Sequence, residues 1–210
     1  MNGHYDTRFL REKYRVTGYL YDLLDAPWER IYRRLRPEIL SGMSGRILEA
    51  GFGTGRNAEH YPAGVEVVAF DLSESMLRFG KRRARVSSAA PRLLQADALR
   101  LPFPPNTFDF YIATFLYCVL PDALQPRALR EMIRVLKPGG RFRLLEILYS
   151  KTLRIRLRQK FFAPFVKTVY GARFDRKTTA FLDEISQVQV LSHRFLHKDT
   201  LLLIEGCVLE

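Results

Sequence analysis

From residue 46 to residue 148 the sequence alternates between short apolar runs and longer amphipathic segments, and this alternation limits the choice of fold most strongly. Five runs have the composition of buried strands: 46–50, 65–70, 92–96, 108–113 and 141–148. Three segments between them have helical spacing or helix caps: 55–61, 73–86 and 122–136. Strands that alternate with helices at this pitch predict an α/β fold whose parallel sheet is covered by helices on both faces.

The two ends of the chain depart from this alternation. Residues 187–209 contain two apolar runs around His197-Lys-Asp, which predict an antiparallel hairpin and bring the sheet to seven strands. Residues 5–40 have helical spacing with an expected break at Asp25-Ala-Pro. These signals divide the chain into two parts: an N-terminal helical lid or membrane-facing segment, 1–45, and a sheet domain, 46–210.

The composition is that of a soluble globular protein, with 47% apolar and 27% charged residues among 210. The longest nearly apolar stretch, 110–120, has 11 residues, whereas a membrane-spanning helix needs roughly 20. The first residues lack the basic-then-apolar layout of a secretory signal. The cysteines and histidines show no spacing typical of a metal site. We therefore expect a cytoplasmic protein that holds no metal and does not cross a membrane.

Positive charge is concentrated after the fifth predicted strand. The chain has 34 Lys and Arg against 22 Asp and Glu, and residues 151–177 hold nine basic side chains and one acidic side chain. Apolar residues recur there at every fourth position, which predicts a basic amphipathic helix in an insert at 150–177. Such a helix suits an anionic membrane surface or, alternatively, the protein's own sheet with its arginines in solvent. The residues expected at the substrate or membrane surface are Tyr19, Tyr149, Arg154, Arg158, Phe161 and Phe165.

The first strand ends in a glycine-rich turn, Glu49-Ala-Gly51-Phe-Gly53-Thr-Gly55-Arg56. Glycines allow the backbone to approach a ligand closely and present N–H groups at a helix N-terminus. In the dinucleotide-binding loop the third glycine comes one position later, where this chain has Arg56. The turn therefore predicts a nucleoside ligand other than NAD.

Two aspartates follow the next two strands. Asp71 comes 20 residues after Gly51, where a carboxylate can accept hydrogen bonds from ribose hydroxyls or, alternatively, share a helix cap with Ser73. Asp97 follows the third strand, where it can accept from an exocyclic amine of a base or cap its own loop. Because the carboxyl ends of parallel strands meet at one edge of the sheet, the turn and both aspartates predict a single ligand-binding crevice.

Several specific motifs occur in a fixed order: 47–55, 70–77, 95–103, 106–109 and 129–140. They begin with Ile47-Leu-Glu-Ala-Gly-Phe-Gly-Thr-Gly and end with Leu-Lys-Pro-Gly-Gly. Together they resemble class I S-adenosylmethionine-dependent methyltransferases, the group that includes quinone-ring C-methyltransferases and bacterial phospholipid N-methyltransferases. The resemblance implies a Rossmann-like, doubly wound sheet of seven strands, mostly parallel with an antiparallel C-terminal strand, and S-adenosylmethionine as the cofactor.

The resemblance also implies a role for each matching residue. Glu49 and the loop glycines would hold the methionine half of the cofactor, and Asp71 would bind its ribose. The full set of implied cofactor residues is Glu49, Gly51, Gly53, Gly55, Asp71, Leu72, Met76, Asp97, Ala98 and Thr114. Leu72 and Met76 would pack on the adenine and Thr114 would face the sulfonium. Many relatives carry a histidine soon after the fourth strand, where this chain has Tyr117-Cys118, so the sequence leaves the acceptor open.

The implied reaction is a direct displacement at a methyl group that is already activated, so alignment and exclusion of water matter more than a nucleophile. The candidate catalytic residues are Tyr21, Tyr117 and Glu146, of which Tyr21 is expected to act as a lid. Each of them can instead serve packing or a backbone hydrogen bond.

The sequence favours an enzyme with a lipophilic, membrane-associated acceptor, most of all a phospholipid headgroup amine of the phosphatidylethanolamine type. The alternatives are a quinone, a soluble small molecule or RNA, and a cofactor-binding subunit without catalysis. No RNA-binding module is recognisable, so we do not expect nucleic acid as a partner. We expect a monomer or homodimer that associates peripherally with the inner face of an anionic membrane.

Overall fold

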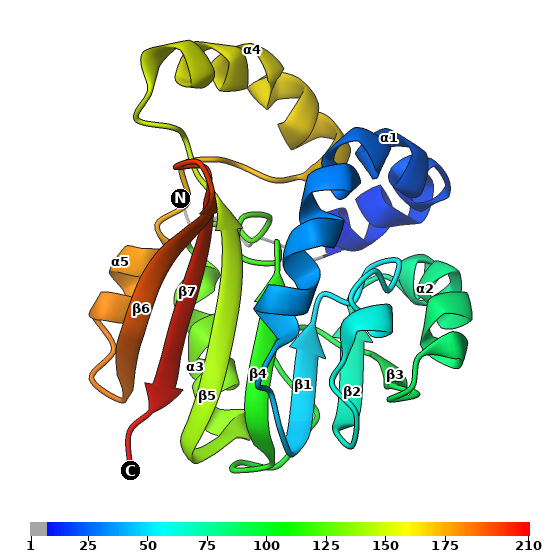
Figure 1. Cartoon of the computed structure of the whole chain (residues 1–210), viewed down its shortest axis with the longest axis vertical. Coiled ribbons are helices and arrows are strands. Elements are labelled where there is room, and N and C mark those ends of the chain that lie inside the picture. Colours follow the sequence, from blue (N-terminus) through cyan, green and yellow to red (C-terminus); the bar gives the residue numbers. More distant parts are fainter. Residues whose placement is uncertain (1–7) are drawn as a thin grey trace.

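The computed structural model describes the backbone of residues 8–210 and the side chains of residues 22–210. Its centre is a seven-stranded sheet in the order β3-β2-β1-β4-β5-β7-β6 (Figure 1). The strands are β1 Arg46–Ala50, β2 Glu66–Asp71, β3 Arg92–Gln95, β4 Phe108–Thr114, β5 Leu136–Ile147, β6 Val188–His197 and β7 Leu201–Val208. The first five pair in parallel, whereas β7 is antiparallel to β5 and β6. The predicted doubly wound sheet with an antiparallel C-terminal hairpin is confirmed.

Helices cover both faces of this sheet. They are α1 Arg8–Leu40, η1 Ala58–His60, α2 Glu74–Val86, α3 Gln125–Val135, α4 Leu153–Tyr170 and α5 Thr178–Asp183. On one face, α1 and α2 contribute Leu40 and Leu77 to a buried cluster. On the opposite face, α3 and α5 contribute Leu129 and Leu182 to a second one. This arrangement explains why the central strands are apolar on both sides.

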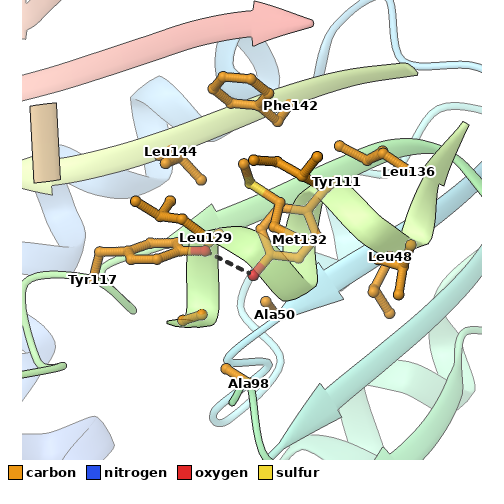
Figure 2. Packing of buried hydrophobic residues seen from close by; sticks show 14 of the residues in the cluster. Leu48, Ala50, Ala98, Tyr111, Tyr117, Leu129, Met132, Leu136, Phe142 and Leu144 are labelled. Carbon is orange, nitrogen blue, oxygen red and sulfur yellow. Dashed lines mark hydrogen bonds between the residues drawn. The ribbon is translucent and has the colours of Figure 1, made fainter. Parts of the chain in front are cut away.

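The larger core cluster lies between the sheet and α3. Tyr111, Phe142 and Leu144 point from β4 and β5 toward Leu129 and Met132 on α3 (Figure 2). All five side chains are almost completely buried. Side chains alternate between the two faces of a strand, so this register fixes which residues of β4 and β5 face α3 and which face α1.

The glycine-rich turn is followed by less helix than the sequence predicts. The expected helix at 55–61 is reduced to the short 3₁₀ turn Ala58–His60. Gly55 has a positive φ of 78° and is therefore not helical. Tyr61 is extended, with a ψ of 138°, since it precedes a proline. Little room for a helix is left between these two residues, and the prediction of one was wrong.

The N-terminal helix α1 runs without interruption from Arg8 to Leu40 and contains Pro27 and Pro37. A proline removes one hydrogen bond and bends a helix without necessarily ending it, and the ribbon of α1 changes direction along its course (Figure 1). The break expected at Asp25-Ala-Pro was therefore wrong. The last turn of α1 packs against one face of the sheet through Ile39 and Leu40. The division of the chain at residue 45 stays a prediction.

The predicted helix in the basic insert is present as α4, which lies beyond the carboxyl ends of the strands (Figure 1). It ends at Gly171, whose φ of 72° is the left-handed conformation common at helix C-termini. Among the helices in the described part of the chain, none is both long and apolar enough to span a bilayer.

Candidate cofactor and acceptor site

A cleft opens at the carboxyl ends of the parallel strands, beside the point where the strand order reverses between β1 and β4. Open α/β sheets bind ligands at this position. All predicted cofactor residues except Gly55 line it: Glu49, Gly51, Gly53, Asp71, Leu72, Met76, Asp97, Ala98 and Thr114. The sequence thus identified one wall of a single cleft, whose other wall comes from α1 and α4.

The glycines of the turn have two different roles: two of them line the cleft and one packs against the core. Gly51 and Gly53 line the cleft with positive φ angles of 73° and 57°. Among the described residues, a Cβ at Gly53 would meet no atom nearer than 3.9 Å, so this part of the loop leaves open space for a ligand. A Cβ at Gly55 would lie 2.7 Å from the ring of Phe52, so Gly55 is required for packing.

Asp71 joins the end of β2 to the glycine-rich turn. Its Oδ2 accepts a hydrogen bond from Gly53 N at 2.8 Å and its Oδ1 accepts one from Ser73 N at 2.8 Å. Burial raises the pKa of Asp71 to about 6 although these N–H donors act against it. The N–H of Leu72 also acts on Asp71. A carboxylate has about four lone-pair sites, so at least one is left to accept from a ribose hydroxyl. Hydroxyl donors would also stabilise the buried charge.

The part of the cleft predicted to hold adenine is formed after β2 and β3. Met76, in the first turn of α2, is buried and lines the cleft, with Leu72 next to it. Asp97 Oδ1 accepts from Leu99 N at 2.9 Å, so this aspartate does cap its own loop. It also lines the cleft together with Ala98. The capping role and a ligand role are compatible, because capping occupies one carboxylate oxygen.

Glu49 is the centre of a buried polar network on the α1 side of β1. Its Oε1 accepts from Asn57 Nδ2 at 2.7 Å and its Oε2 accepts from the Tyr61 hydroxyl. Asn57 also donates to Thr114 Oγ1 at 3.2 Å and accepts from Arg36. Burial raises the pKa of Glu49 to about 8, against the effects of Asn57 and Arg36. A cationic ligand group near Glu49, such as an α-ammonium, would favour its ionised form.

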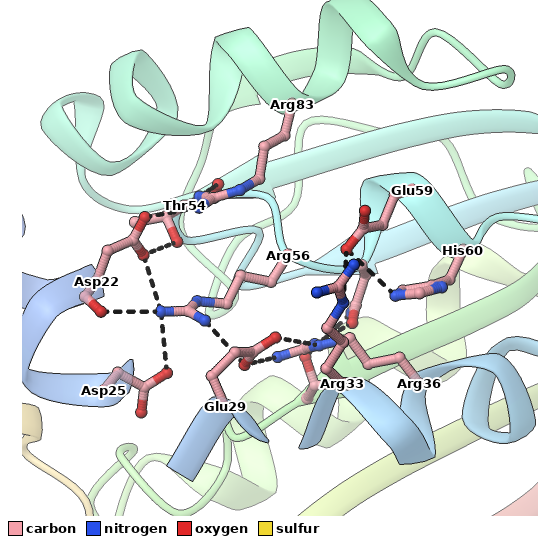
Figure 3. Close-up of polar contacts among 12 residues, drawn as sticks. Asp22, Asp25, Glu29, Arg33, Arg36, Thr54, Arg56, Glu59, His60 and Arg83 are labelled. Atoms are coloured by element: carbon pink, nitrogen blue, oxygen red, sulfur yellow. Dashed lines mark hydrogen bonds and ion pairs between the residues drawn. The ribbon is translucent and has the colours of Figure 1, made fainter. Parts of the chain in front are cut away.

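Arg56 fastens α1 over the glycine-rich turn (Figure 3). Its guanidinium lies 3.2 Å from Asp22 Oδ1, 3.5 Å from Asp25 Oδ2 and 3.1 Å from Glu29 Oε2. Glu29 in turn forms two contacts with Arg36, at 3.1 and 2.8 Å. The residue that distinguishes this loop from a dinucleotide-binding loop therefore anchors the helix that closes the cleft.

Asp22 forms further contacts that connect α1 to the glycine-rich turn. Its Oδ2 lies 2.8 Å from Arg83 on α2, and its Oδ1 accepts from Thr54 Oγ1 at 2.7 Å. Arg83 also donates to Thr54 O at 2.8 Å. These contacts hold α1, α2 and the turn together at the rim of the cleft.

The far end of the cleft is apolar and aromatic. Val166 and Tyr170 of α4 pack there with Cys118 and Ala172, and all four are buried. Aromatic side chains from three other parts of the chain complete the lining: Trp28, Tyr32, Phe115 and Phe174. The ring centroids of Tyr32 and Phe115 are 4.7 Å apart. The cleft therefore passes from a polar end to an end suited to an apolar, flat group.

Two predicted catalytic residues lie outside this cleft. Tyr117 is completely buried behind the sheet, 3.4 Å from the hydroxyl of Tyr111 (Figure 2). Glu146 is also buried, with its Oε2 3.4 Å from Thr178 Oγ1, and burial raises its pKa to about 8. Phe115, with a positive φ of 62°, turns the chain after β4 so that Tyr117 returns to the core. Neither side chain touches the cleft, and neither is retained as a catalytic candidate.

The remaining predicted catalytic and surface residues lie in different places. The side chains of Tyr19 and Tyr21 lie outside the described residues. Tyr149 packs on Phe174, with ring centroids 5.2 Å apart, and lies behind the cleft lining. The predicted surface residues on α4 are all exposed: Arg154, Arg158, Phe161 and Phe165.

Comparison with known proteins agrees with this geometry. Residues 47–140 match the family described as "Methyltransferase domain". This segment is a methyltransferase domain. The resemblance to class I S-adenosylmethionine-dependent methyltransferases is thereby confirmed, and with it S-adenosylmethionine as the cofactor of the group.

Two curated relatives of the methyltransferase domain extend the match beyond it. The chain is 37% identical over 161 residues to the demethylmenaquinone methyltransferase of Renibacterium salmoninarum, covering 75% of this chain. It is 38% identical over 133 residues to the ubiquinone/menaquinone biosynthesis C-methyltransferase UbiE of Pseudomonas entomophila, covering 60% of this chain. The chain spans 59% and 51% of the lengths of these two relatives.

Solved structures show the same fold at low identity. A possible histamine N-methyltransferase from Thermotoga maritima has a TM-score of 0.68 at 20% identity, covering 93% of this chain and 99% of its own. The geranyl diphosphate C-methyltransferase of Streptomyces coelicolor, solved with S-adenosyl-L-homocysteine, has a TM-score of 0.66 at 14% identity, covering 86% of this chain and 76% of its own. These likenesses confirm the fold of the methyltransferase domain.

Proposed function

We propose that this chain transfers a methyl group from S-adenosylmethionine to a lipophilic small molecule, with the ring of a reduced quinone as the preferred acceptor class. The observation that carries the proposal is the continuity of the cleft. Its polar end holds Asp71, Glu49 and the glycine-rich turn, and its apolar end is roofed by Val166 and Tyr170 of α4. A cofactor and an apolar acceptor can therefore meet within one enclosed site.

The chain's own residues provide binding, orientation and exclusion of water. Bound S-adenosylmethionine supplies a methyl group that is already activated for transfer. Asp71 would accept from the ribose, Met76 would pack on the base, and Glu49 would attract the ammonium group. The ion pairs of Arg56 keep α1 over the turn, which shields the site from solvent.

The acceptor end favours an aromatic ring over a phospholipid headgroup amine. A zwitterionic headgroup needs charged or hydrogen-bonding partners when it is buried, whereas this end presents aromatic and aliphatic side chains. The names of the curated relatives also refer to quinones. Both observations favour the quinone alternative, and the phosphatidylethanolamine-type acceptor predicted from the sequence has no comparable support.

The proposed function includes peripheral binding to an anionic membrane through α4. Its Leu153, Leu157 and Phe161 are 66%, 58% and 79% exposed, which is unusual for large apolar side chains in a soluble protein. Residues 151–170 carry six basic and no acidic side chains, so anionic lipid complements their charge. Because the C-terminal end of α4 lines the cleft, a lipid surface at this helix would place a lipophilic acceptor beside the entrance.

Transfer of labelled methyl groups tests the proposed function. The protein would be incubated with methyl-labelled S-adenosylmethionine and either reduced demethylmenaquinone or phosphatidylethanolamine, both in anionic vesicles. We expect label in the quinone and none with an Asp71→Ala variant, which removes the ribose-binding carboxylate. Label in the phospholipid alone would overturn the acceptor class, and label in neither substrate would overturn the proposed function.

A further inference from the structure

Asp25 is a carboxylate of α1 that the sequence did not identify as a site residue. It is buried and lines the cleft. It shares one face of α1 with Trp28, Tyr32 and Arg36, at helical spacings of three and four residues, and all four line the cleft. The fold therefore directs this carboxylate into the cleft from the wall opposite the strands.

The cleft-lining carboxylates do not have equal freedom to accept a proton. Both oxygens of Glu49 and both oxygens of Asp71 accept hydrogen bonds from groups of the chain. Asp97 lies on the adenine side and caps its own loop. Asp25 is held by an ion pair with Arg56, at 3.5 Å, and this contact leaves carboxylate lone pairs for another donor.

The surroundings of Asp25 place it between the two ends of the cleft. Arg56 belongs to the glycine-rich turn, on the cofactor side. On the acceptor side, Tyr32 lies about two turns further along the same face of α1, and both Tyr32 and Tyr170 line the cleft together with Asp25. A ring hydroxyl of an acceptor bound between these phenols and the glycine-rich turn would meet Asp25.

We infer that Asp25 is the residue that accepts the acceptor's proton during methyl transfer. The inference rests on the proposed function. A hydroquinone ring carbon becomes more nucleophilic as a ring hydroxyl gives its proton to the Asp25 carboxylate. The ring carbon then forms a bond to the methyl carbon while the carbon–sulfur bond breaks and its electron pair stays on sulfur. Loss of the hydrogen from that ring carbon and return of a proton to the ring oxygen restore the hydroquinone, with one proton released overall.

The charges around Asp25 suit a base that works near neutral pH. Burial raises its pKa to about 6, with Glu29 and Asp22 of α1 acting in the same direction. Arg56 of the turn and Arg36 of α1 act against them. The carboxylate is thus ionised at pH 7 and can still hold a proton in the transition state. Below pH 6 it is protonated before the reaction begins, so the rate of transfer falls.

The test combines kinetics with a titration of the protein alone. Turnover with reduced demethylmenaquinone would be measured from pH 5 to pH 8.5 for the wild type, Asp25→Asn, Asp25→Glu and Asp22→Asn. We expect Asp25→Asn to lower kcat by about 100-fold and to abolish the acidic limb of the rate profile. Asp25→Glu should restore the limb, and Asp22→Asn should keep it, although it also breaks an ion pair of Arg56.

Carboxyl-carbon NMR of the cofactor-free wild type should show two groups that titrate near pH 6, Asp71 and Asp25, and only the Asp25 signal should be missing in Asp25→Asn. Affinity for S-adenosylmethionine should change less than threefold, which would separate loss of the base from loss of the cofactor site. Wild-type turnover together with an Asp25→Asn profile that keeps both kcat and the acidic limb would overturn the role of Asp25 alone. Absence of wild-type turnover on the quinone would overturn the proposed function and this role with it.

Discussion

Replacing Arg56 with alanine tests whether α1 is held over the cleft by the ion pairs described above. The substitution leaves Asp25 and Glu29, whose side chains are 13% and 15% exposed, without the guanidinium between them. Removing one partner of a buried ion pair costs about 3–5 kcal/mol. We expect the lower end, about 3 kcal/mol, because Glu29 keeps Arg36 and Asp22 keeps Arg83.

For a protein of this size each kcal/mol lowers the melting temperature by about 2–4 °C, so Arg56→Ala should melt about 6–12 °C below the wild type. Circular dichroism would measure the unfolding, and limited proteolysis would report release of α1. Arg33→Ala is a suitable control, since the Arg33–Glu59 pair is exposed and its closest atoms are 3.9 Å apart. A loss of less than 1 kcal/mol in Arg56→Ala, or an equal loss in both variants, would refute the proposed anchoring of α1.

Three further outcomes follow from the cleft and from α4. Asp71→Asn should weaken binding of S-adenosylmethionine about 10- to 100-fold in calorimetry, because a hydrogen bond to a charged group contributes about 1.5–3 kcal/mol; unchanged affinity would remove Asp71 from the ribose site. Cofactor binding should release protons between about pH 5 and pH 8, because Glu49 is protonated in the free protein below its pKa of about 8 and a bound ammonium group favours its ionised form. Calorimetric titrations in buffers of different ionisation enthalpy would detect the released protons, and Glu49→Gln should abolish the release. Arg154→Glu combined with Arg158→Glu should weaken binding to anionic vesicles at least about 30-fold in a sedimentation assay, because each basic residue near the surface contributes about 1 kcal/mol. Replacing Lys81 and Arg82 on α2 with glutamate is the control, and an equal loss of vesicle binding in both double variants would argue against α4 as the docking helix.

Much of the cofactor side could be predicted from local sequence. Gly51, Gly53 and Asp97 each follow a strand within a few residues and Asp71 ends one, and the ends of parallel strands meet at one edge of the sheet. Strand periodicity and turn chemistry therefore located these residues without any tertiary information. Gly55 matched the same motif but serves packing against Phe52, which only the three-dimensional contacts reveal.

The acceptor side and the anchoring of α1 could not be predicted in this way, because the residues involved come together from distant parts of the chain. Arg56 meets Asp22 across 34 positions, and no local pattern announces that contact. Tyr117 follows β4 closely, but the left-handed turn at Phe115 sends its side chain into the core. Glu146 lies near the end of β5, on the face toward α3 and away from the cleft. A position near the end of a strand therefore identified a site residue only where the chain at that position lines the cleft, and not where it turns back into the core.

Helix α1 links the two ends of the cleft, and this explains why a segment before the methyltransferase domain matters to the site within it. Arg36, near its C-terminal end, contacts Asn57 and so reaches the network of Glu49. About two turns earlier along the same face Trp28 lines the acceptor end, and about three turns earlier Asp25 lies between the two ends. The ion pairs of Arg56 hold α1 between these two groups of contacts, so their loss would release the helix at both ends of the cleft at once. The Arg56→Ala variant should therefore lose affinity for S-adenosylmethionine as well as stability, whereas loosening of the acceptor end alone would leave cofactor affinity unchanged.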